Sequence, residues 1–251
     1  MRQAPVGDDS LLRSRQLGLP HGNMEEMADP LKAIFFDVGN TLLFPDRGTI
    51  LRSLYRKNVT PSLAQWHAIE REIKNRFDDL VQHGGPVDHG FWRMFYTRLL
   101  AEVASEDEGL CNELVEATRH SANWCEIRPG TRESLERLGK RYALAVISNA
   151  DGKIAAVLER CGIAGCFRSI TDSGLVGYEK PHPVIFDVAL RDMKVAAEES
   201  LYVGDVYSVD YLGATRAGMQ AILFDVAGAY RRTDLPRVES LEELEKKLAT
   251  A

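Results

Sequence analysis

Five short apolar runs, separated by segments with helical periodicity, constrain the fold of this chain more than any other feature. Each run has the length and composition of a buried strand. The helical segments include GTRESLERLGKR, GKIAAVLERCGI and PHPVIFDVALRDM, the last of which opens with prolines that suit a first helical turn. Strands that alternate with helices predict an α/β fold with a doubly wound parallel sheet. The predicted strands are residues 32–38, 142–149, 168–173, 200–205 and 220–226.

The first two predicted strands are separated by about a hundred residues, whereas a single crossover helix needs only about a dozen. Residues 49–123 carry helical patterns, and we expect one helix to start at a Thr60 cap followed by Pro61. We therefore predict an all-helical cap subdomain at 47–125 that covers the carboxyl edge of the sheet. The α/β core would consist of 28–46 and 126–251.

Residues 1–27 show no clear periodicity and no apolar core of a signal peptide. We interpret them as a disordered tail or as an incorrectly assigned start, because Met24 and Met27 stand just before the first predicted strand.

Composition excludes several classes of function. The net charge is −6 and the basic residues are scattered, which argues against a nucleic-acid partner. No apolar stretch approaches the roughly 20 residues that span a bilayer, so we expect no membrane association. The four cysteines lack the spacing of a zinc site, and we expect reduced thiols in a cytoplasmic protein.

Polar residues follow the predicted strands at the edge where ligands bind in parallel sheets. Together these residues suit phosphoryl transfer: a carboxylate can attack phosphorus, a lysine and Mg²⁺ can neutralise the oxygens, and a hydroxyl can orient them. Each motif alone is explained equally well by a turn or a helix cap. Their order, each after its own strand, favours the functional interpretation. The residues are Asp37, Ser148, Asn149, Lys180, Asp205 and Asp210.

Across about residues 31–228, these motifs and the insertion resemble the haloacid dehalogenase-like (HAD) hydrolase superfamily, whose members share a Rossmann-like core and often a helical cap. The resemblance implies that Asp37 is a nucleophile that forms an aspartyl-enzyme intermediate. It also implies that Ser148 and Lys180 hold the phosphoryl group. Thr41 matches the threonine of the first motif, and Asn149 follows the motif serine.

The resemblance further implies an Mg²⁺ site in a phosphatase-type member that acts on a small phosphorylated metabolite. Asp205 would bind the ion, and Asp210 would support it directly or through water. In the phosphatase branch the first motif usually reads D-x-D, and the second aspartate shuttles a proton. Here that position is Gly39, which still offers a backbone carbonyl to the metal but no proton. A positioned acid or base contributes typically 10²- to 10⁴-fold.

Four functions remain open. A phosphatase could use a good leaving group, metal-bound water or another residue, with Asp46, His83 and His89 as candidates that we interpret as surface turn residues. A 2-haloacid dehalogenase expels halide without a proton and needs no metal. A phosphonate hydrolase needs a cap lysine, but we expect Lys57 and Lys74 to be solvated. A non-catalytic HAD-fold binding protein is supported by Gly39 alone.

Substrate choice should depend on the cap segment HGGPVDHGFWRMFY. Trp92 and Tyr96 could line a pocket, although the spacing of Trp92, Phe95 and Leu99 favours packing inside the cap. Candidates to bind a second anionic group are Arg52, Arg56 and Arg93.

Overall fold

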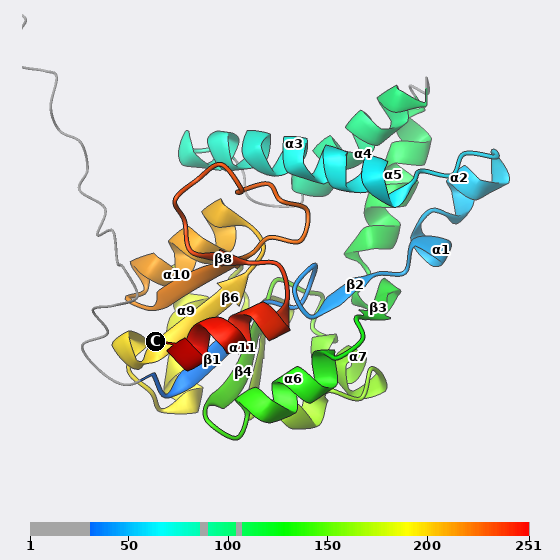
Figure 1. Ribbon diagram of the computed structural model, residues 1–251. Coiled ribbons are helices and arrows are strands. Elements are labelled where there is room, and N and C mark those ends of the chain that lie inside the picture. Colours follow the sequence, from blue (N-terminus) through cyan, green and yellow to red (C-terminus); the bar gives the residue numbers. More distant parts are fainter. Residues whose placement is uncertain (1–30, 86–89, 104–106, 251) are drawn as a thin grey trace, which may run out of the picture.

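The computed structural model describes residues 31–85, 90–103 and 107–250, so the tail at 1–27 lies outside the described residues (Figure 1). The described chain forms a six-stranded parallel sheet in the order β5-β4-β1-β6-β7-β8. All five predicted strands are confirmed. The short β8 escaped prediction because its two residues do not stand out from polar neighbours. The strands are β1 Ala33–Phe36, β4 Ala143–Ser148, β5 Ser169–Asp172, β6 Ser200–Gly204, β7 Gln220–Phe224 and β8 Arg237–Val238.

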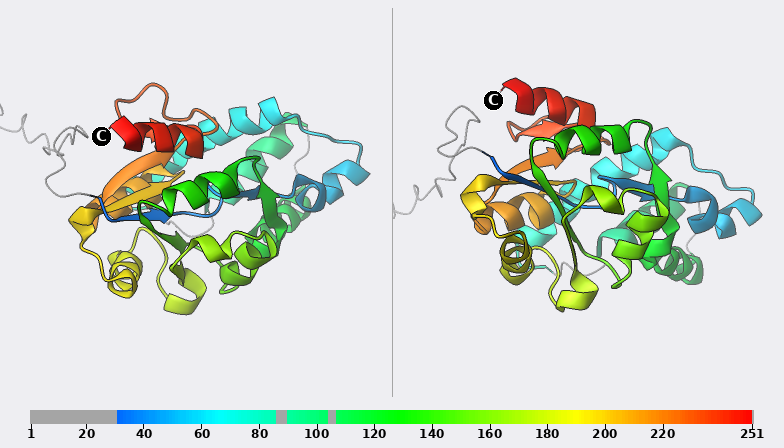
Figure 2. Two further views of the ribbon diagram at one scale, coloured as in Figure 1. Left: turned by 60° about the horizontal axis from the view of Figure 1, so that its bottom comes forward. Right: turned by 90° about the horizontal axis from the view of Figure 1, so that it is seen from below.

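Helices cover both faces of the sheet (Figure 2). Side chains alternate along β1, so Ile34 and Phe36 face one layer while Ala33 and Phe35 face the other, all fully buried. Burial on both faces explains why the strands are continuous apolar runs. The doubly wound α/β fold is thus confirmed. The first layer contains α6 Thr131–Leu138, α7 Ile154–Arg160 and α11 Leu241–Thr250, and the second contains α9 Pro183–Met193 and α10 Leu212–Arg216.

A helical unit is inserted between β1 and β4, and we call it the cap (Figure 1). The chain leaves the core through β2 (Leu43–Pro45) and returns through β3 (Trp124–Ile127), which pair as an antiparallel ribbon. The cap has a hydrophobic core of its own, in which Phe95 and Leu99 are buried as their spacing predicts. Its helices are α1 Arg47–Ile50, α2 Arg52–Arg56, α3 Leu63–Gln82, α4 Gly90–Glu102 and α5 Glu108–Arg119.

Helix α3 has its N-cap two residues later than the sequence suggested. The predicted Thr60 cap is wrong, because Ser62 is the N-cap and its hydroxyl accepts the backbone N–H of Gln65 at 3.2 Å. The Gln65 side chain in turn accepts the backbone N–H of Ser62 at 2.9 Å. This reciprocal capping box satisfies two N–H groups that a cap at Thr60 would leave open.

Helix α3 also ties the cap to the core beside the carboxyl ends of the strands. The Asp78 carboxylate accepts the backbone N–H of Ser208 at 2.9 Å and the Tyr230 hydroxyl at 2.8 Å. Arg71 donates to the carbonyl of Ala227 at 2.9 Å. The cap is therefore held over that edge of the sheet by buried polar contacts.

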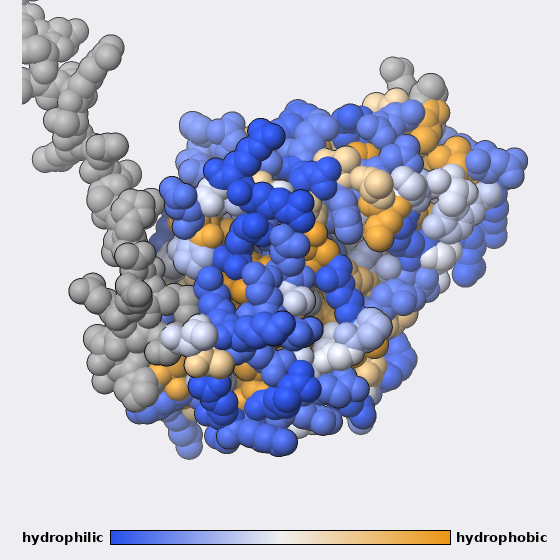
Figure 3. Space-filling view, viewed as in Figure 1, coloured by the Kyte–Doolittle hydropathy of each residue, from blue (hydrophilic) through white to orange (hydrophobic). Residues whose placement is uncertain are grey.

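The molecular face in Figure 3 is mainly hydrophilic, with hydrophobic residues in small patches. Among the described helices, none has both the length and the apolar character needed to cross a bilayer. All four cysteines are free thiols. The remaining short elements are α8 Ser173–Val176, η1 Ser121–Asn123, η2 Ala164–Cys166, η3 Ala197–Glu199 and η4 Tyr207–Tyr211.

Candidate active site

Asp37 follows the last residue of β1 and starts a tight turn. Its backbone N–H bonds to the carbonyl of Val203 at 2.8 Å, which extends the β1–β6 ladder by one residue. Asn40 then takes a left-handed φ of 53°, a conformation that asparagine tolerates better than most residues. The turn returns the Thr41 hydroxyl to 3.5 Å from Asp37 Oδ2. The Asp37 side chain is buried, and its contact with Thr41 helps to fix the direction of the carboxylate.

Lys180 neutralises this carboxylate from the opposite side. Its Nζ lies 2.7 Å from Asp37 Oδ1, from Asp210 Oδ1 and from the Tyr202 hydroxyl. The Asn149 side chain accepts the backbone N–H of Lys180 at 2.7 Å and donates to its carbonyl at 3.0 Å. Asn149 therefore positions the lysine backbone, while the ammonium makes three polar contacts with protein groups.

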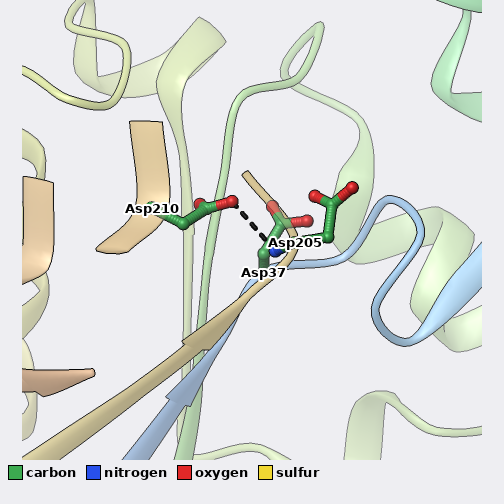
Figure 4. A group of neighbouring side chains, drawn as sticks. All are labelled: Asp37, Asp205 and Asp210. Atoms are coloured by element: carbon green, nitrogen blue, oxygen red, sulfur yellow. Dashed lines mark hydrogen bonds between the residues drawn. The ribbon is translucent and has the colours of Figure 1, made fainter. Parts of the chain in front are cut away.

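The segment from Gly204 to Asp210 is organised by the Asp210 carboxylate (Figure 4). Its Oδ2 accepts the backbone N–H groups of Asp205 at 3.1 Å and Val206 at 2.9 Å. A Cβ at Gly204 would lie 2.5 Å from Asp210 Cγ, so only glycine permits this approach. The segment continues as a single π-helical turn, a feature frequent at functional sites.

The carboxylates of Asp37, Asp205 and Asp210 form one buried cluster at the ends of β1 and β6 (Figure 4). Each offers one oxygen, and these oxygens lie within 4.8 Å of one another. Burial raises the pKa of Asp37 to about 6, although Lys180 opposes the shift, and raises the pKa of Asp205 to about 7 against the attraction of Lys74. Three carboxylate oxygens are a donor set that fits a hard divalent cation such as Mg²⁺.

Asp205 has a partner that we expected to be solvated. Lys74, on the cap helix α3, is 1% exposed, and its Nζ lies 2.8 Å from Asp205 and 2.9 Å from Glu70. Burial disfavours the ammonium, but the two carboxylates outweigh it and raise the pKa of Lys74. The expectation for Lys74 is wrong, whereas Lys57 is exposed and pairs with Asp107 at the surface.

A cavity of about 590 Å³ lies between the cap and the core, and the predicted site residues other than Thr41 line it. Asp37, Ser148 and Lys180 line it together with Asn149, Gly39 and the two aspartates that follow β6. Its cap side is aromatic, with Phe77, Phe91 and Trp92 of the cap helices and Trp124 of β3. A third stretch of the wall is polar and consists of Glu116, Arg119, His120, Ser121, Asp151 and Glu179.

The residues considered as substitutes for the missing acid lie elsewhere. Asp46 caps α1 by accepting from the backbone N–H of Thr49 at 3.1 Å. His83 is exposed at the end of α3, and His89 lies outside the described residues. Arg93 bonds to Asn112 at the surface at 2.8 Å, and neither it nor Arg52 or Arg56 lines the cavity.

Sequence reasoning missed several residues of the site. Lys74 and Glu70 fall within the buried stripe of α3 formed by Trp66, Ile69, Ile73 and Phe77, which is the signal that could have revealed them. Tyr202 sits in an apolar run, where its hydroxyl requires a partner. No sequence pattern identified Trp124, Arg119 and His120 as site residues. They reach the cavity only because the chain passes it on its way from the cap back to the core.

The chain is similar in sequence to two phosphatases. It is 34% identical over 197 residues to glyceraldehyde 3-phosphate phosphatase of Methanothermobacter thermautotrophicus, covering 77% of this chain and 85% of the relative. It is 28% identical over 205 residues to 5-amino-6-(5-phospho-D-ribitylamino)uracil phosphatase YigB of Escherichia coli. This match covers 76% of this chain and 82% of YigB.

Among solved structures, the HAD hydrolase YfnB of Bacillus subtilis, determined with bound magnesium, superposes with a TM-score of 0.65 at 20% identity. The superposition covers 88% of this chain and 99% of YfnB, and it supports the fold. A family model described as haloacid dehalogenase-like hydrolase matches residues 31–218. The chain therefore belongs to the haloacid dehalogenase-like hydrolase family.

Proposed function

We propose that this hydrolase is a Mg²⁺-dependent phosphatase that acts on a small phosphorylated metabolite through an aspartyl-phosphate intermediate. The observation that carries the proposal is the setting of Asp37, which lines the cavity with its carboxylate 2.7 Å from Lys180 and beside two further carboxylates. The relatives support the substrate class, because the names of both describe phosphatases of small phosphate esters.

In the proposed reaction, an Asp37 oxygen attacks phosphorus and forms an O–P bond. The ester bond breaks, and its electron pair leaves with the alcohol oxygen, which takes a proton from water because residue 39 is glycine. Lys180 and Ser148 hold the phosphoryl oxygens during this step. A water molecule then attacks phosphorus, which releases orthophosphate and restores the Asp37 carboxylate.

The residues that would hold Mg²⁺ are Asp37, Asp205 and the backbone carbonyl of Gly39, with Asp210 as a direct or water-mediated support. The clustering of three carboxylate oxygens within 4.8 Å supports this assignment. When bound, Mg²⁺ would neutralise charge on the phosphoryl oxygens. Asp210 would at the same time keep the 205–206 backbone in place through its two N–H contacts.

The other functions fit the site less well. A dehalogenase is favoured by Gly39, but its chemistry needs no metal and therefore does not call for the cluster of three carboxylates. A phosphonate hydrolase needs a free cap lysine in the cavity, whereas Lys74 is engaged by two carboxylates and does not line it. A non-catalytic binding protein would not require the buried Asp37–Lys180 pair.

The test is hydrolysis of phenyl phosphate by the wild type and by Asp37→Asn, with and without Mg²⁺. A phenol leaves readily without a proton, because its pKa resembles the roughly 10 of a tyrosine side chain. We expect turnover only by the wild type and only with Mg²⁺. A folded wild type that is inert, or an Asp37→Asn variant that remains active, contradicts the proposal. Halide release from a 2-haloacid in the same samples tests the dehalogenase alternative.

A further inference from the structure

The indole of Trp124 covers the side-chain position of residue 39. The φ of Gly39 lies outside the left-handed range, so its backbone conformation is open to other residues. A Cβ built there would lie 3.2 Å from Cζ3, 3.5 Å from Cη2 and 3.6 Å from Cε3 of Trp124. All three atoms belong to the six-membered ring of the indole. The space into which a side chain from residue 39 would extend is therefore bordered by an aromatic surface.

Two contacts fix this indole in place. Its Nε1–H donates to the carbonyl of Thr118 at 2.8 Å, at the end of α5. Its ring also meets Trp92 of α4 edge to face, with centroids 5.6 Å apart. Trp92 in turn stacks on Tyr96 at 6.0 Å. The half-buried rings of Trp92 and Trp124 both line the cavity, so they present fixed aromatic surface to whatever the cavity contains.

The chemistry of the cavity divides between two ends. Attack by Asp37 requires the phosphorus atom to lie at the polar end, beside Asp37, Ser148 and Lys180. The leaving group must then occupy the remaining space, which is bordered by the aromatic cap side and by the polar stretch that includes Arg119 and His120. Aromatic surfaces bind planar rings through edge-to-face and offset-stacked contacts that a saturated ring of the same size cannot make equally well.

We propose that Trp124, together with Trp92, forms a leaving-group subsite that binds a planar ring, and that the substrates are phosphate monoesters carrying an aromatic or heteroaromatic ring. This inference rests on the proposed phosphatase function and adds a substrate class to it. Trp124 is a specificity-determining residue in this arrangement. Its ring borders position 39, where glycine supplies no polar side chain, and the cavity of about 590 Å³ is large enough for a ring beyond the phosphate.

The test compares two non-hydrolysable ligands, benzylphosphonate and cyclohexylmethylphosphonate, which share the phosphonate and the connectivity but differ in ring planarity. Their dissociation constants are measured by titration calorimetry in Mg²⁺. We expect the wild type to bind benzylphosphonate roughly 2- to 10-fold more tightly, the range of an aromatic pair contact. Trp124→Phe should keep most of this preference, and Trp124→Leu should lose it.

The two variants form a matched pair. Both remove the Nε1–H donor to Thr118, so a structural effect of that loss is common to them, and only the aromatic ring distinguishes them. Thermal unfolding of both variants confirms that they are folded. The inference is overturned if wild type binds the two phosphonates equally, if Trp124→Leu keeps the preference, or if neither phosphonate binds.

Failure of this inference is distinguishable from failure of the phosphatase proposal. Hydrolysis of phenyl phosphate that depends on Asp37 and Mg²⁺, combined with equal binding of the two phosphonates, rejects the planar-ring subsite alone. A preference for benzylphosphonate that disappears in Trp124→Leu supports the subsite. It does so independently of turnover, because calorimetry requires no catalysis.

Discussion

Two buried lysines meet the same carboxylate cluster from two different parts of the molecule. Lys180 comes from the core and contacts Asp37 and Asp210, whereas Lys74 comes from the cap and contacts Asp205. Both are no more than 2% exposed. The core therefore does not balance its own charges, because one of the cations comes from the inserted helical unit. The charge state of the candidate metal site depends on how the cap is docked.

The largest effect is expected for Lys180→Met, which keeps the length of the side chain and removes its charge. Loss of one member of a buried ion pair destabilises proteins by about 3–5 kcal/mol, and loss of a charge-stabilising donor lowers turnover by about 10²- to 10³-fold. Urea unfolding and phenyl phosphate hydrolysis check both expectations. A variant that retains a tenth of wild-type turnover contradicts the role of Lys180.

Lys74→Met separates the cap lysine from the core lysine. In EDTA we expect a loss of about 3 kcal/mol in unfolding free energy, because Asp205 and Glu70 lose their shared partner. Saturating Mg²⁺ should shrink this loss, since a cation bound at Asp205 replaces the ammonium. The readout is the unfolding free energy in EDTA and in Mg²⁺. An equal loss in both conditions argues against Asp205 as a metal ligand.

Mg²⁺ affinity should fall as the pH falls. Without Mg²⁺, burial raises the pKa of Asp205 to about 7 and the pKa of Asp37 to about 6. A protonated carboxylate must lose its proton before it binds a metal. Between about pH 7 and pH 6 the affinity should drop roughly tenfold, with proton release on binding. Calorimetry in two buffers of different ionisation enthalpy measures both quantities. An affinity that stays constant over this range contradicts the raised pKa values.

The smallest effect is expected for Lys57→Met, the matched control within the same cap. Its ammonium pairs with Asp107, and both side chains are about half exposed, at 54% and 44%. Exposed pairs contribute about 0–1 kcal/mol, so unfolding free energy and Mg²⁺ affinity should remain close to wild type. A large decrease in unfolding free energy or Mg²⁺ affinity in Lys57→Met would show that loss of any cap lysine has this effect. The effect of Lys74→Met could then not be attributed to its contact with Asp205.

The sequence was sufficient for five of the six strands of the sheet and for the placement of Asp37, Ser148 and Lys180 at its edge. Strands buried on both faces are continuous apolar runs, which the sequence shows directly. Asp37 and Ser148 stand at the ends of such runs, and Lys180 precedes a helix that is marked by prolines. The β2–β3 ribbon was not predicted, since its strands are short and partly exposed.

The cap half of the site depends on docking, which no local pattern encodes. Lys74 cannot be distinguished from a solvated lysine of a charged helix until the opposite surface is known. Trp124 lies 85 positions after Gly39, and only the return of the chain through β3 brings its ring to that glycine. Long-range juxtapositions of this kind require the three-dimensional structure.

The antiparallel β2–β3 ribbon makes the two chain crossings into the cap neighbours. An insertion whose ends meet in this way can be exchanged as a module, because the recipient core needs only one attachment point. In this protein such an exchange would also transfer or remove the contact of Lys74 with Asp205 and that of Trp124 with Gly39. Recombination of caps between homologous cores would therefore alter the electrostatics of metal binding together with substrate choice, and the two properties would be inherited as one trait.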